Sequence, residues 1–296
     1  MESGRRPGDR GEAHRPGPVI RTLPMLGYAP NISWLFPELP FALRPRAVAD
    51  AGFEALEFGF PSHADLDALD ACRRQDGIQI VLFNQDVPVW DTANRGYLAD
   101  MKRRDEFERT LDQALEIALR LGVAKVMLPA GVELADTSRQ AQCECVLANL
   151  RVAALQAAEA GVLLTIEVLN PSDNPGYFLT SWREAVDIVR QVDHPNVRLQ
   201  MDTYQLQRLE GRLVEKVRED IGWIGHFQFA DEPGRHEPGT GAIDFPELDA
   251  VIEAAGYEGY IGLEYVPQAE GAKSLAWVPA VRRALGRRAR RTIEKR

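Results

Sequence analysis

The stretch "LLTIEVLN", residues 163–170, places one carboxylate inside a run that otherwise has the composition of a buried strand. A run this apolar and β-branched is typical of a parallel strand that is covered on both faces. Burying a lone carboxylate costs on the order of several kcal/mol, so Glu167 must be paired, hydrogen-bonded, protonated or bound to a metal ion. The other strands of the chain narrow this choice.

Seven more strand-like runs alternate with longer helical patterns, at residues 23–29, 53–60, 78–84, 124–131, 197–203, 224–231 and 260–266. Four of the eight runs follow a glycine that suits the left-handed end of a helix, at Gly52, Gly122, Gly161 and Gly256. Eight strands with intervening helices predict an α/β fold of the (β/α)8, or TIM-barrel, type. An open doubly wound sheet is the alternative, but "GYAPNIS" is not the glycine-rich turn that such a sheet usually has after its first strand.

The two ends of the chain differ in composition from its body. Residues 1–21 are rich in Gly, Pro and Arg and lack the apolar stretch of a secretory signal, so we expect a disordered leader. Residues 282–296 form a basic tail of net charge +7. A barrel of roughly 250 residues forms a single domain, which places the predicted barrel at 22–281.

Charge and cysteine content limit the partners of the chain. The leader carries net +2 and the tail +7, which leaves −18 for residues 22–281 of a chain whose net charge is −9. A body this acidic repels nucleic acid, and no apolar run approaches the ~18 residues of a membrane span. Three cysteines are too few for a disulfide framework, so we expect a reducing, cytoplasmic location. Whether the chain forms a homo-oligomer is left open.

Four polar residues occupy the same place in the last four predicted strands: Glu167, Asp202, Gln228 and Glu264. They are separated by 35, 26 and 36 residues, which is close to one strand-helix unit each time. Residues at the same point of successive barrel strands meet at one mouth, and the C-terminal mouth carries the chemistry in this fold. Any one of them alone has an equally good structural explanation.

Three carboxylates at one mouth repel one another unless a positive charge lies among them. No lysine or arginine lies inside these strands near the four residues. A divalent cation is the simplest counter-charge, and an all-oxygen donor set suits Mg²⁺ or Mn²⁺ better than Zn²⁺. The four residues are therefore predicted to be metal ligands.

Further polar residues are placed to act beside this metal. His226 precedes Gln228 by two positions and points to the same face, where it contacts substrate, supports the metal or is an ordinary core histidine. Asn170 and Glu57 are secondary candidates for substrate binding.

The loop "DEPGRHEPGTGAIDF", residues 231–245, follows the seventh strand. Its glycines offer backbone N–H groups for an anion. Arg235 is a cation near the mouth that is suited to gripping a carboxylate or a hydroxyl group, although a plain surface arginine fits equally.

Several motifs together resemble the hydroxypyruvate isomerase family, which belongs to the wider xylose isomerase-like barrels. They are "LTIEVLNPSDNPGYFLT", "LQMDTYQLQRLEG", "HFQFADEPGRHEPGTGAIDF" and "IGLEYVPQ", supported by "MLGYAPNISWLF" and by Trp90 with "RG" at 95–96. The resemblance implies the same four metal ligands, with Glu167 and Glu264 also acting as the proton-transfer pair. It also implies that Arg235 binds substrate.

This chain departs from the family pattern at three positions. Phe83 precedes Asn84 where the family has a histidine, and Pro171 follows Asn170 where a polar residue is usual. Gln205 stands at the histidine position of a D-x-Y-H motif and is included among the predicted substrate-binding residues. The resemblance therefore supports isomerase chemistry more firmly than it supports hydroxypyruvate as the substrate.

The predicted activity is metal-assisted isomerisation of a small hydroxy-carbonyl or sugar-acid substrate through an enediolate, without a redox cofactor. A keto-sugar 3-epimerase or a lyase with the same metal ligands is the alternative, because the loops decide where the proton returns. A non-catalytic sugar-binding protein is a further alternative, but it has no need of carboxylates on opposite sides of one metal.

Overall fold

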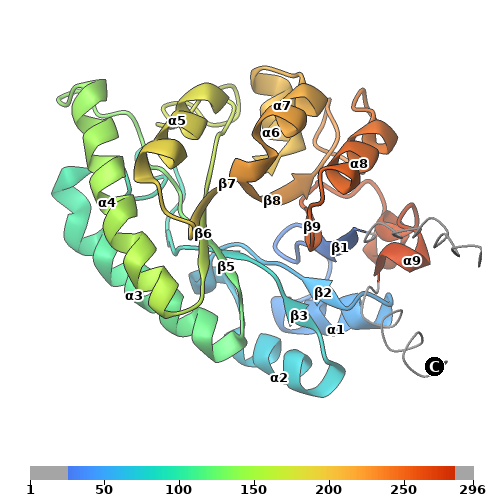
Figure 1. Cartoon of the computed structure of the whole chain (residues 1–296). Coiled ribbons are helices and arrows are strands. Elements are labelled where there is room, and N and C mark those ends of the chain that lie inside the picture. Colours follow the sequence, from blue (N-terminus) through green and yellow to red (C-terminus); the bar gives the residue numbers. More distant parts are fainter. Residues whose placement is uncertain (1–25, 284–296) are drawn as a thin grey trace, which may run out of the picture.

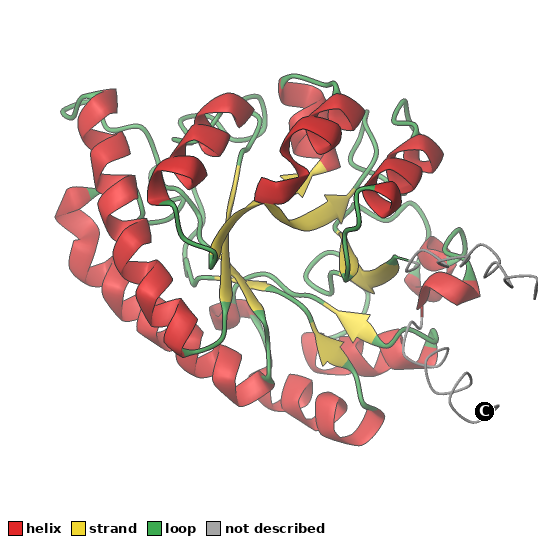
Figure 2. Cartoon of the chain, viewed as in Figure 1, coloured by secondary structure: helices red, strands yellow, loops and turns green. Residues whose placement is uncertain are grey.

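The computed structural model describes residues 26–283, in which a curled parallel sheet lies inside a ring of helices (Figures 1 and 2). Seven strands pair in the order β1-β9-β8-β7-β6-β5-β4, and β2 pairs with β3. Their bounds are β1 Gly27–Pro30, β2 Ala55–Leu56, β3 Gln79–Ile80, β4 Phe83–Asn84, β5 Lys125–Met127, β6 Leu163–Glu167, β7 Val197–Asp202, β8 Ile224–Phe229 and β9 Tyr260–Leu263.

The β2–β3 pair closes the ring between β1 and β4. Glu57 donates its N–H to the carbonyl of Pro30 at 3.0 Å, and Phe58 donates to the carbonyl of Leu82 at 3.2 Å. The predicted barrel is therefore confirmed. One predicted strand, 78–84, is divided into β3 and β4, because its first part pairs with β2 and its second part with β5.

Helices follow the strands around the outside of the barrel (Figure 2). They are α1 Arg44–Asp50, α2 Leu66–Asp76, α3 Arg104–Leu121, α4 Arg139–Glu159, α5 Trp182–Val192, α6 Thr203–Leu209, α7 Leu213–Asp220, α8 Phe245–Ala254 and α9 Ala280–Arg283. Gly122 ends α3 in the left-handed conformation with φ of 66°, as its position before a strand predicts. Short 3-10 helices occupy several of the loops.

Alternation along β6 explains how a carboxylate enters the barrel. Thr165 and Glu167 both contact Gln200 of the neighbouring strand, so they share the inner face. Leu164 and Ile166 are fully buried on the opposite face, where the helices pack. The apolar residues of the stretch thus hold the strand between two layers, and the polar ones line the barrel interior.

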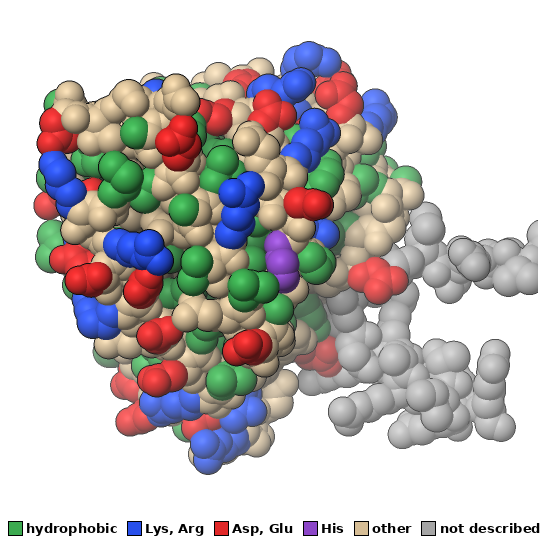
Figure 3. Space-filling view, turned by 60° about the vertical axis from the view of Figure 1, so that its left-hand side comes forward, with side chains coloured by type: hydrophobic (Ala, Val, Ile, Leu, Met, Phe, Trp, Pro, Cys, Tyr) green, Lys and Arg blue, Asp and Glu red, His purple; other side chains and the backbone are tan. Residues whose placement is uncertain are grey.

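The surface and the ends of the described chain bear on the predictions made for them. Acidic and basic side chains are intermixed on the face in Figure 3. None of the helices in the described part of the chain is long and apolar enough to span a bilayer. The predicted leader and most of the predicted basic tail lie outside the described residues. Arg282 and Arg283 belong to α9, and Arg282 pairs with Asp249 and Glu253, so the folded part extends to residue 283.

Candidate active site

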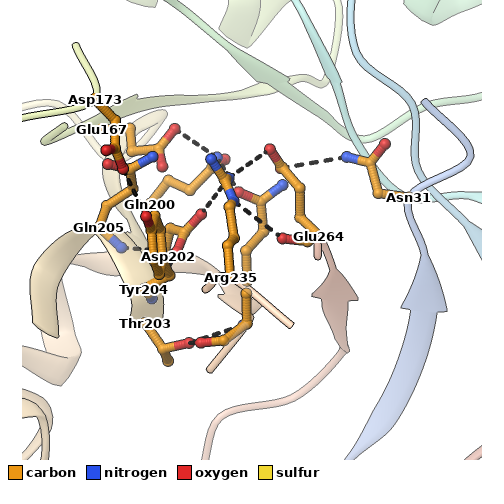
Figure 4. Close-up of polar contacts among 12 residues, drawn as sticks. Asn31, Glu167, Asp173, Gln200, Asp202, Thr203, Tyr204, Gln205, Arg235 and Glu264 are labelled. Atoms are coloured by element: carbon orange, nitrogen blue, oxygen red, sulfur yellow. Dashed lines mark hydrogen bonds and ion pairs between the residues drawn. The ribbon is translucent and has the colours of Figure 1, made fainter. Parts of the chain in front are cut away.

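The four predicted metal ligands lie at the C-terminal ends of four adjacent strands. In the parallel register Glu167 is opposite Gln200, and Asp202 is opposite Gln228. Glu264 directly follows β9, whose residue Gly262 is opposite Gln228. The four residues therefore meet at one mouth of the barrel, as predicted. Figure 4 shows three of them, Glu167, Asp202 and Glu264.

Glu167 is buried, with 5% of its surface exposed, and its contacts are with neutral groups. Its Oε2 accepts a hydrogen bond from Nε2 of Gln200 at 3.1 Å, and it makes no ion pair with the described residues. Burial raises the pKa of Glu167 well above its ordinary value, and the charges of Asp202 and Glu264 raise that pKa further. The carboxylate thus lies close to two others without a cation of its own.

Asp202 links the strand to the following helix. Its Oδ1 accepts the backbone N–H groups of Tyr204 at 2.8 Å and Gln205 at 3.1 Å, which caps α6. Its Oδ2 lies 2.9 Å from Nη2 of Arg235. Burial raises the pKa of Asp202, although Arg235 and the two cap hydrogen bonds act in the opposite direction.

Arg235 lies between two of the carboxylates. Its Nη2 is 2.9 Å from Oδ2 of Asp202 and 2.9 Å from Oε1 of Glu264 (Figure 4). The guanidinium carbon lies 4.4 Å from the ring centre of Trp34 and 5.3 Å from that of Tyr204. The residue that the sequence left as either a substrate ligand or a surface arginine is thus a cation inside the site.

The loop that carries Arg235 is organised around a buried carboxylate. Oδ2 of Asp231 accepts the N–H groups of Gly239 at 2.9 Å and Gly241 at 2.8 Å, and Oδ1 accepts those of Glu232 at 2.8 Å and Ile243 at 3.1 Å. The sequence indicates that glycines of this loop could offer N–H groups to an anion, and for Gly239 and Gly241 the acceptor is the Asp231 side chain of the same chain.

Glu264 contacts the site from the last strand. Its Oε2 accepts a hydrogen bond from Nδ2 of Asn31 at 3.3 Å, and its Oε1 faces Arg235. Burial raises the pKa of Glu264 to about 8, with Asp202 and Glu57 raising it and Arg235 lowering it. Its side chain is 16% exposed, more than Glu167 or Asp202.

Gln228 is held in one orientation by its neighbours. Its Nε2 donates to Oε1 of Glu57 at 2.6 Å, and its Oε1 accepts from Nε2 of Gln200 at 2.8 Å. The side chain of Gln228 also forms a hydrogen bond with Glu264. Its amide nitrogen therefore serves carboxylates, and its oxygen, the end required of a metal ligand, is occupied by Gln200.

Glu57 and His226 lie beneath this layer and do not line the cavity described below. Both are fully buried, with Nε2 of His226 2.8 Å from Oε2 of Glu57. Nδ1 of His226 lies 3.4 Å from Nζ of Lys125. Burial raises the pKa of Glu57 to about 8 and lowers that of Lys125 to about 8, and burial and Lys125 together lower the pKa of His226. Glu57 therefore holds the Gln228 side chain through its hydrogen bond, and His226 holds Glu57.

Asn170 and Gln205 contact each other at the edge of the site. Oε1 of Gln205 accepts from the backbone N–H of Asn170 at 3.0 Å and from its Nδ2 at 2.7 Å. Gln205 lines the cavity, whereas Asn170 positions the loop after β6 through this pair. Neither contact tests the predicted substrate-binding roles.

A cavity of about 640 Å³ opens above these residues. Two of the four predicted metal ligands, Glu167 and Glu264, line it, and Asp202 and Gln228 do not. The predicted substrate-binding residues Arg235 and Gln205 also line it, together with Trp34, Phe60 and Trp90. Sequence reasoning missed two polar residues of the floor, Asn31 and Gln200. The signal for Gln200 is present, because it precedes Asp202 by two positions in the same strand. Asn31 follows the first strand and has no such partner in the sequence.

A metal ion fits the donor types but not the present arrangement of the side chains. Among residues 26–283 no three His, Cys, Asp or Glu side chains are arranged to share one ion, and Asp202 and Glu264 both contact Arg235. When all three carboxyl groups are ionised, one guanidinium leaves two negative charges without a counter-charge. A divalent cation would balance these two charges if the guanidinium of Arg235 moved away from Asp202 and Glu264.

Comparisons with known proteins agree with the fold and the motifs. A profile of the xylose isomerase-like TIM barrel family matches residues 45–281. The 2-oxo-tetronate isomerase of Cupriavidus necator is 38% identical over 252 residues, which cover 85% of this chain and 96% of that one. The hydroxypyruvate isomerase of Escherichia coli is 34% identical over 258 residues, which cover 87% of this chain and all of that one.

Solved structures give the same result. The crystal structure of an AP endonuclease, family 2, from Brucella melitensis superposes with a TM-score of 0.82 at 37% identity, covering 86% of this chain and 98% of that one. The crystal structure of a D-psicose 3-epimerase from Clostridium cellulolyticum has a TM-score of 0.68 at 22% identity, which shows a shared fold alone. The chain belongs to the xylose isomerase-like TIM barrel family, as its motifs predict.

Proposed function

We propose that this isomerase moves the carbonyl group of a small hydroxy-oxo acid to the neighbouring hydroxyl-bearing carbon, with the help of Mg²⁺ or Mn²⁺. The observation that carries the proposal is the cluster of Glu167, Asp202 and Glu264 at one barrel mouth with Arg235 as its nearest cation. The relatives named as isomerases of 2-oxo-tetronate and hydroxypyruvate support the substrate class, since both compounds carry a carboxylate beside the reacting carbons.

The metal would be held by oxygen atoms from four strand ends, contributed by Glu167, Asp202, Gln228 and Glu264. Glu57 holds the amide nitrogen of Gln228, and the amide oxygen would leave Gln200 to reach the ion. When bound, the cation polarises the substrate carbonyl and acidifies the adjacent C–H bond. It also supplies the positive charge that this group of carboxylates lacks.

Glu167 and Glu264 are the proposed proton-transfer pair. They extend from β6 and β9, which lie on different sides of the Asp202 and Gln228 strands in the sheet order. One carboxylate takes the proton from the hydroxyl-bearing carbon and leaves an enediolate, and the other returns a proton to the former carbonyl carbon. The hydroxyl proton moves to the former carbonyl oxygen, so atoms and electrons balance without an oxidant.

Arg235 and Gln205 are proposed to bind the substrate oxygens. Both line the cavity, and Arg235 carries hydrogen-bond donors that a metal would release from Asp202 and Glu264. A guanidinium beside a forming enediolate stabilises its negative charge. The arginine therefore has a role both before and after a metal enters.

Deuterium uptake tests the proposal directly. Purified protein with Mg²⁺ or Mn²⁺ is incubated in D₂O with hydroxypyruvate, 2-oxo-tetronate and a set of neutral ketoses, and the products are followed by NMR. We expect deuterium at the former carbonyl carbon of the product, which is an aldehyde from hydroxypyruvate and a 3-oxo acid from 2-oxo-tetronate. Deuterium that returns to the same carbon with inversion would indicate an epimerase instead. The absence of exchange with every compound and both metals would contradict the proposal.

A further inference from the structure

Arg95 is a buried guanidinium without a carboxylate partner. It is 6% exposed and lies in the loop between β4 and α3. The one hydrogen bond of its guanidinium in the described part of the chain runs from Nη1 to Oδ1 of Asn174, and its buried Nε has no partner. A buried charge of this kind is costly unless something else neutralises it. The structure therefore leaves a cation without its counter-ion.

The guanidinium packs behind two residues of the active-site cavity. Its central carbon lies 5.4 Å from the ring centre of Trp90, and its Nη1 donates to Asn174. Trp90 and Asn174 both line the cavity, whereas Arg95 itself does not. The placement is built into the fold, because Gly131 donates its N–H to the carbonyl of Arg95 at 3.0 Å.

Gly96 fixes the backbone beside Arg95. It has a φ of 112°, and a Cβ atom there would lie 2.2 Å from the carbonyl oxygen of Pro129. Gly96 also forms an isolated bridge with Ala130, next to β5. The backbone next to Arg95 is therefore fixed by its packing against the barrel, and this fixes the position from which the Arg95 side chain extends.

The carboxylates in this region have other partners. Asp91 is exposed, and its Oδ1 accepts the N–H groups of Ala93 at 2.7 Å and Asn94 at 2.9 Å. Oδ2 of Asp173 accepts the hydroxyl of Tyr204 at 2.6 Å. Neither forms an ion pair with Arg95. The charge of Asp91 acts on Arg95 only at longer range, so the guanidinium has no carboxylate in direct contact.

Arg44 is a different kind of cavity residue. It lines the cavity, but Nε donates to the carbonyl of Leu39 at 2.9 Å and Nη1 to that of Ile32 at 2.8 Å. Nη2 reaches the carbonyl of Pro37 at 3.4 Å. All three nitrogens thus tie down the loop after β1. Arg95 has the free donors that an anion needs.

We propose that Arg95 selects the carboxylate of the substrate, with the hydroxy-carbonyl end of the same molecule at Glu167 and Glu264. The carboxylate replaces the amide oxygen of Asn174 as acceptor and takes the unused donors of the guanidinium. A planar guanidinium binds a carboxylate through two parallel hydrogen bonds, which a neutral CH₂OH group cannot accept in the same way. The inference rests on the proposed function and adds the residue that separates acids from neutral ketoses.

Two substrates that differ in one group provide the test. Hydroxypyruvate and dihydroxyacetone share the HOCH₂–CO unit, and the first has a carboxylate where the second has CH₂OH. For Arg95→Met we expect KM for hydroxypyruvate to rise by ~10- to 100-fold, the range of a lost charge-assisted hydrogen bond, with kcat within about threefold. KM for dihydroxyacetone should not change. Arg95→Lys should give an intermediate KM for the acid.

Arg103 offers a matched control. Its guanidinium carbon lies 4.3 Å from the ring centre of Tyr97 in the same region, but it pairs with Glu106 and donates to Asn94. Arg103→Met should leave both KM values unchanged. A purely structural Arg95 predicts early melting of Arg95→Met, whereas an unpaired buried cation predicts an equal or higher melting temperature. The unreactive dicarboxylate tartronate should raise the melting temperature of the wild type but not of Arg95→Met.

The outcomes separate this inference from the proposed function. Equal loss of affinity for the acid and the neutral ketose overturns the role of Arg95 and leaves isomerase activity standing. If the wild type turns over no hydroxy-carbonyl compound, the proposed function fails. Tartronate binding by calorimetry to the wild type and to Arg95→Met then decides the role of Arg95 alone, and equal affinities overturn it.

Discussion

Oε2 of Glu167 accepts a hydrogen bond of 3.1 Å from Nε2 of Gln200, its register neighbour on β7. A neutral amide orients a carboxylate but does not neutralise it. Burial, with Asp202 and Glu264 nearby, holds the pKa of Glu167 well above its ordinary range. The metal-free protein therefore keeps Glu167 in an unfavourable environment, which is characteristic of a residue retained for function.

Replacing Glu167 with Gln is expected to separate stability from activity. The substitution keeps the size and one oxygen that can face Gln200, and it removes a charge that repels Asp202 and Glu264. Melting temperature should stay the same or rise. The metal-saturated rate should fall by ~10²–10⁴-fold, as expected for a lost general base. Both quantities are measured on the same sample.

Glu133→Gln is the control for this substitution, because Glu133 is exposed and pairs with Arg139 at the surface. It should change the free energy of unfolding by less than about 0.5 kcal/mol and leave the rate unchanged. If Glu167→Gln instead loses about 3–5 kcal/mol of stability and turns over normally, Glu167 is a structural carboxylate.

Removal of divalent ions should lower both activity and melting temperature. When Glu167, Asp202 and Glu264 are all ionised, they carry two negative charges in excess of Arg235, so a bound cation stabilises the folded state. At a metal concentration of about 100 times Kd the gain is about 2.7 kcal/mol. The measurement is a thermal melt with EDTA, followed by addition of Mg²⁺ or Mn²⁺. Unchanged melting and turnover in EDTA, together with no ion in metal analysis, would refute the metal site.

The metal-free protein should lose stability as pH rises from about 5 to about 8. Burial raises the pKa of Glu264 to about 8 and that of Glu57 to about 8, so the folded state binds more protons than the unfolded state in this window. Above pH 8 the sign reverses for Lys125, whose pKa is lowered to about 8, because its unfolded form then binds the extra proton. Urea titrations at several pH values measure the slope. Glu264→Gln should flatten the fall between pH 5 and 8, and an unchanged slope would show that Glu264 does not cause it.

Gly262→Ala should destabilise the barrel under the site. A Cβ atom at this position would lie 2.4 Å from each carboxylate oxygen of Glu57, which is fixed by Asn31, Gln228 and His226. Overpacking of this kind costs typically about 1–3 kcal/mol of unfolding free energy. Denaturant unfolding measures the loss. Gly222→Ala is the control, because a Cβ atom there meets nothing within 4 Å. Equal stability of the two variants would mean that Glu57 moves easily.

The sequence by itself determined the barrel and its four in-phase polar residues. Apolar composition, strand polarity and the period of two are local properties, so they place Glu167 and Asp202 inside the mouth without any coordinates. Gly122 and Gly161, each just before a strand, likewise adopt the left-handed conformation that their position at a helix end predicts. Local pattern was sufficient for these features because each depends on a few neighbouring residues.

Only the tertiary structure decided which groups meet. Arg235 lies between Asp202 and Glu264, Asp231 takes the N–H groups of its own loop, and Arg95 is left without a carboxylate. The division of the strand at 78–84 is another such feature, since its two halves pair with different partners. These contacts depend on long-range register and on the course of loops, which close through hydrogen bonds between segments far apart in the chain. No local pattern carries that information.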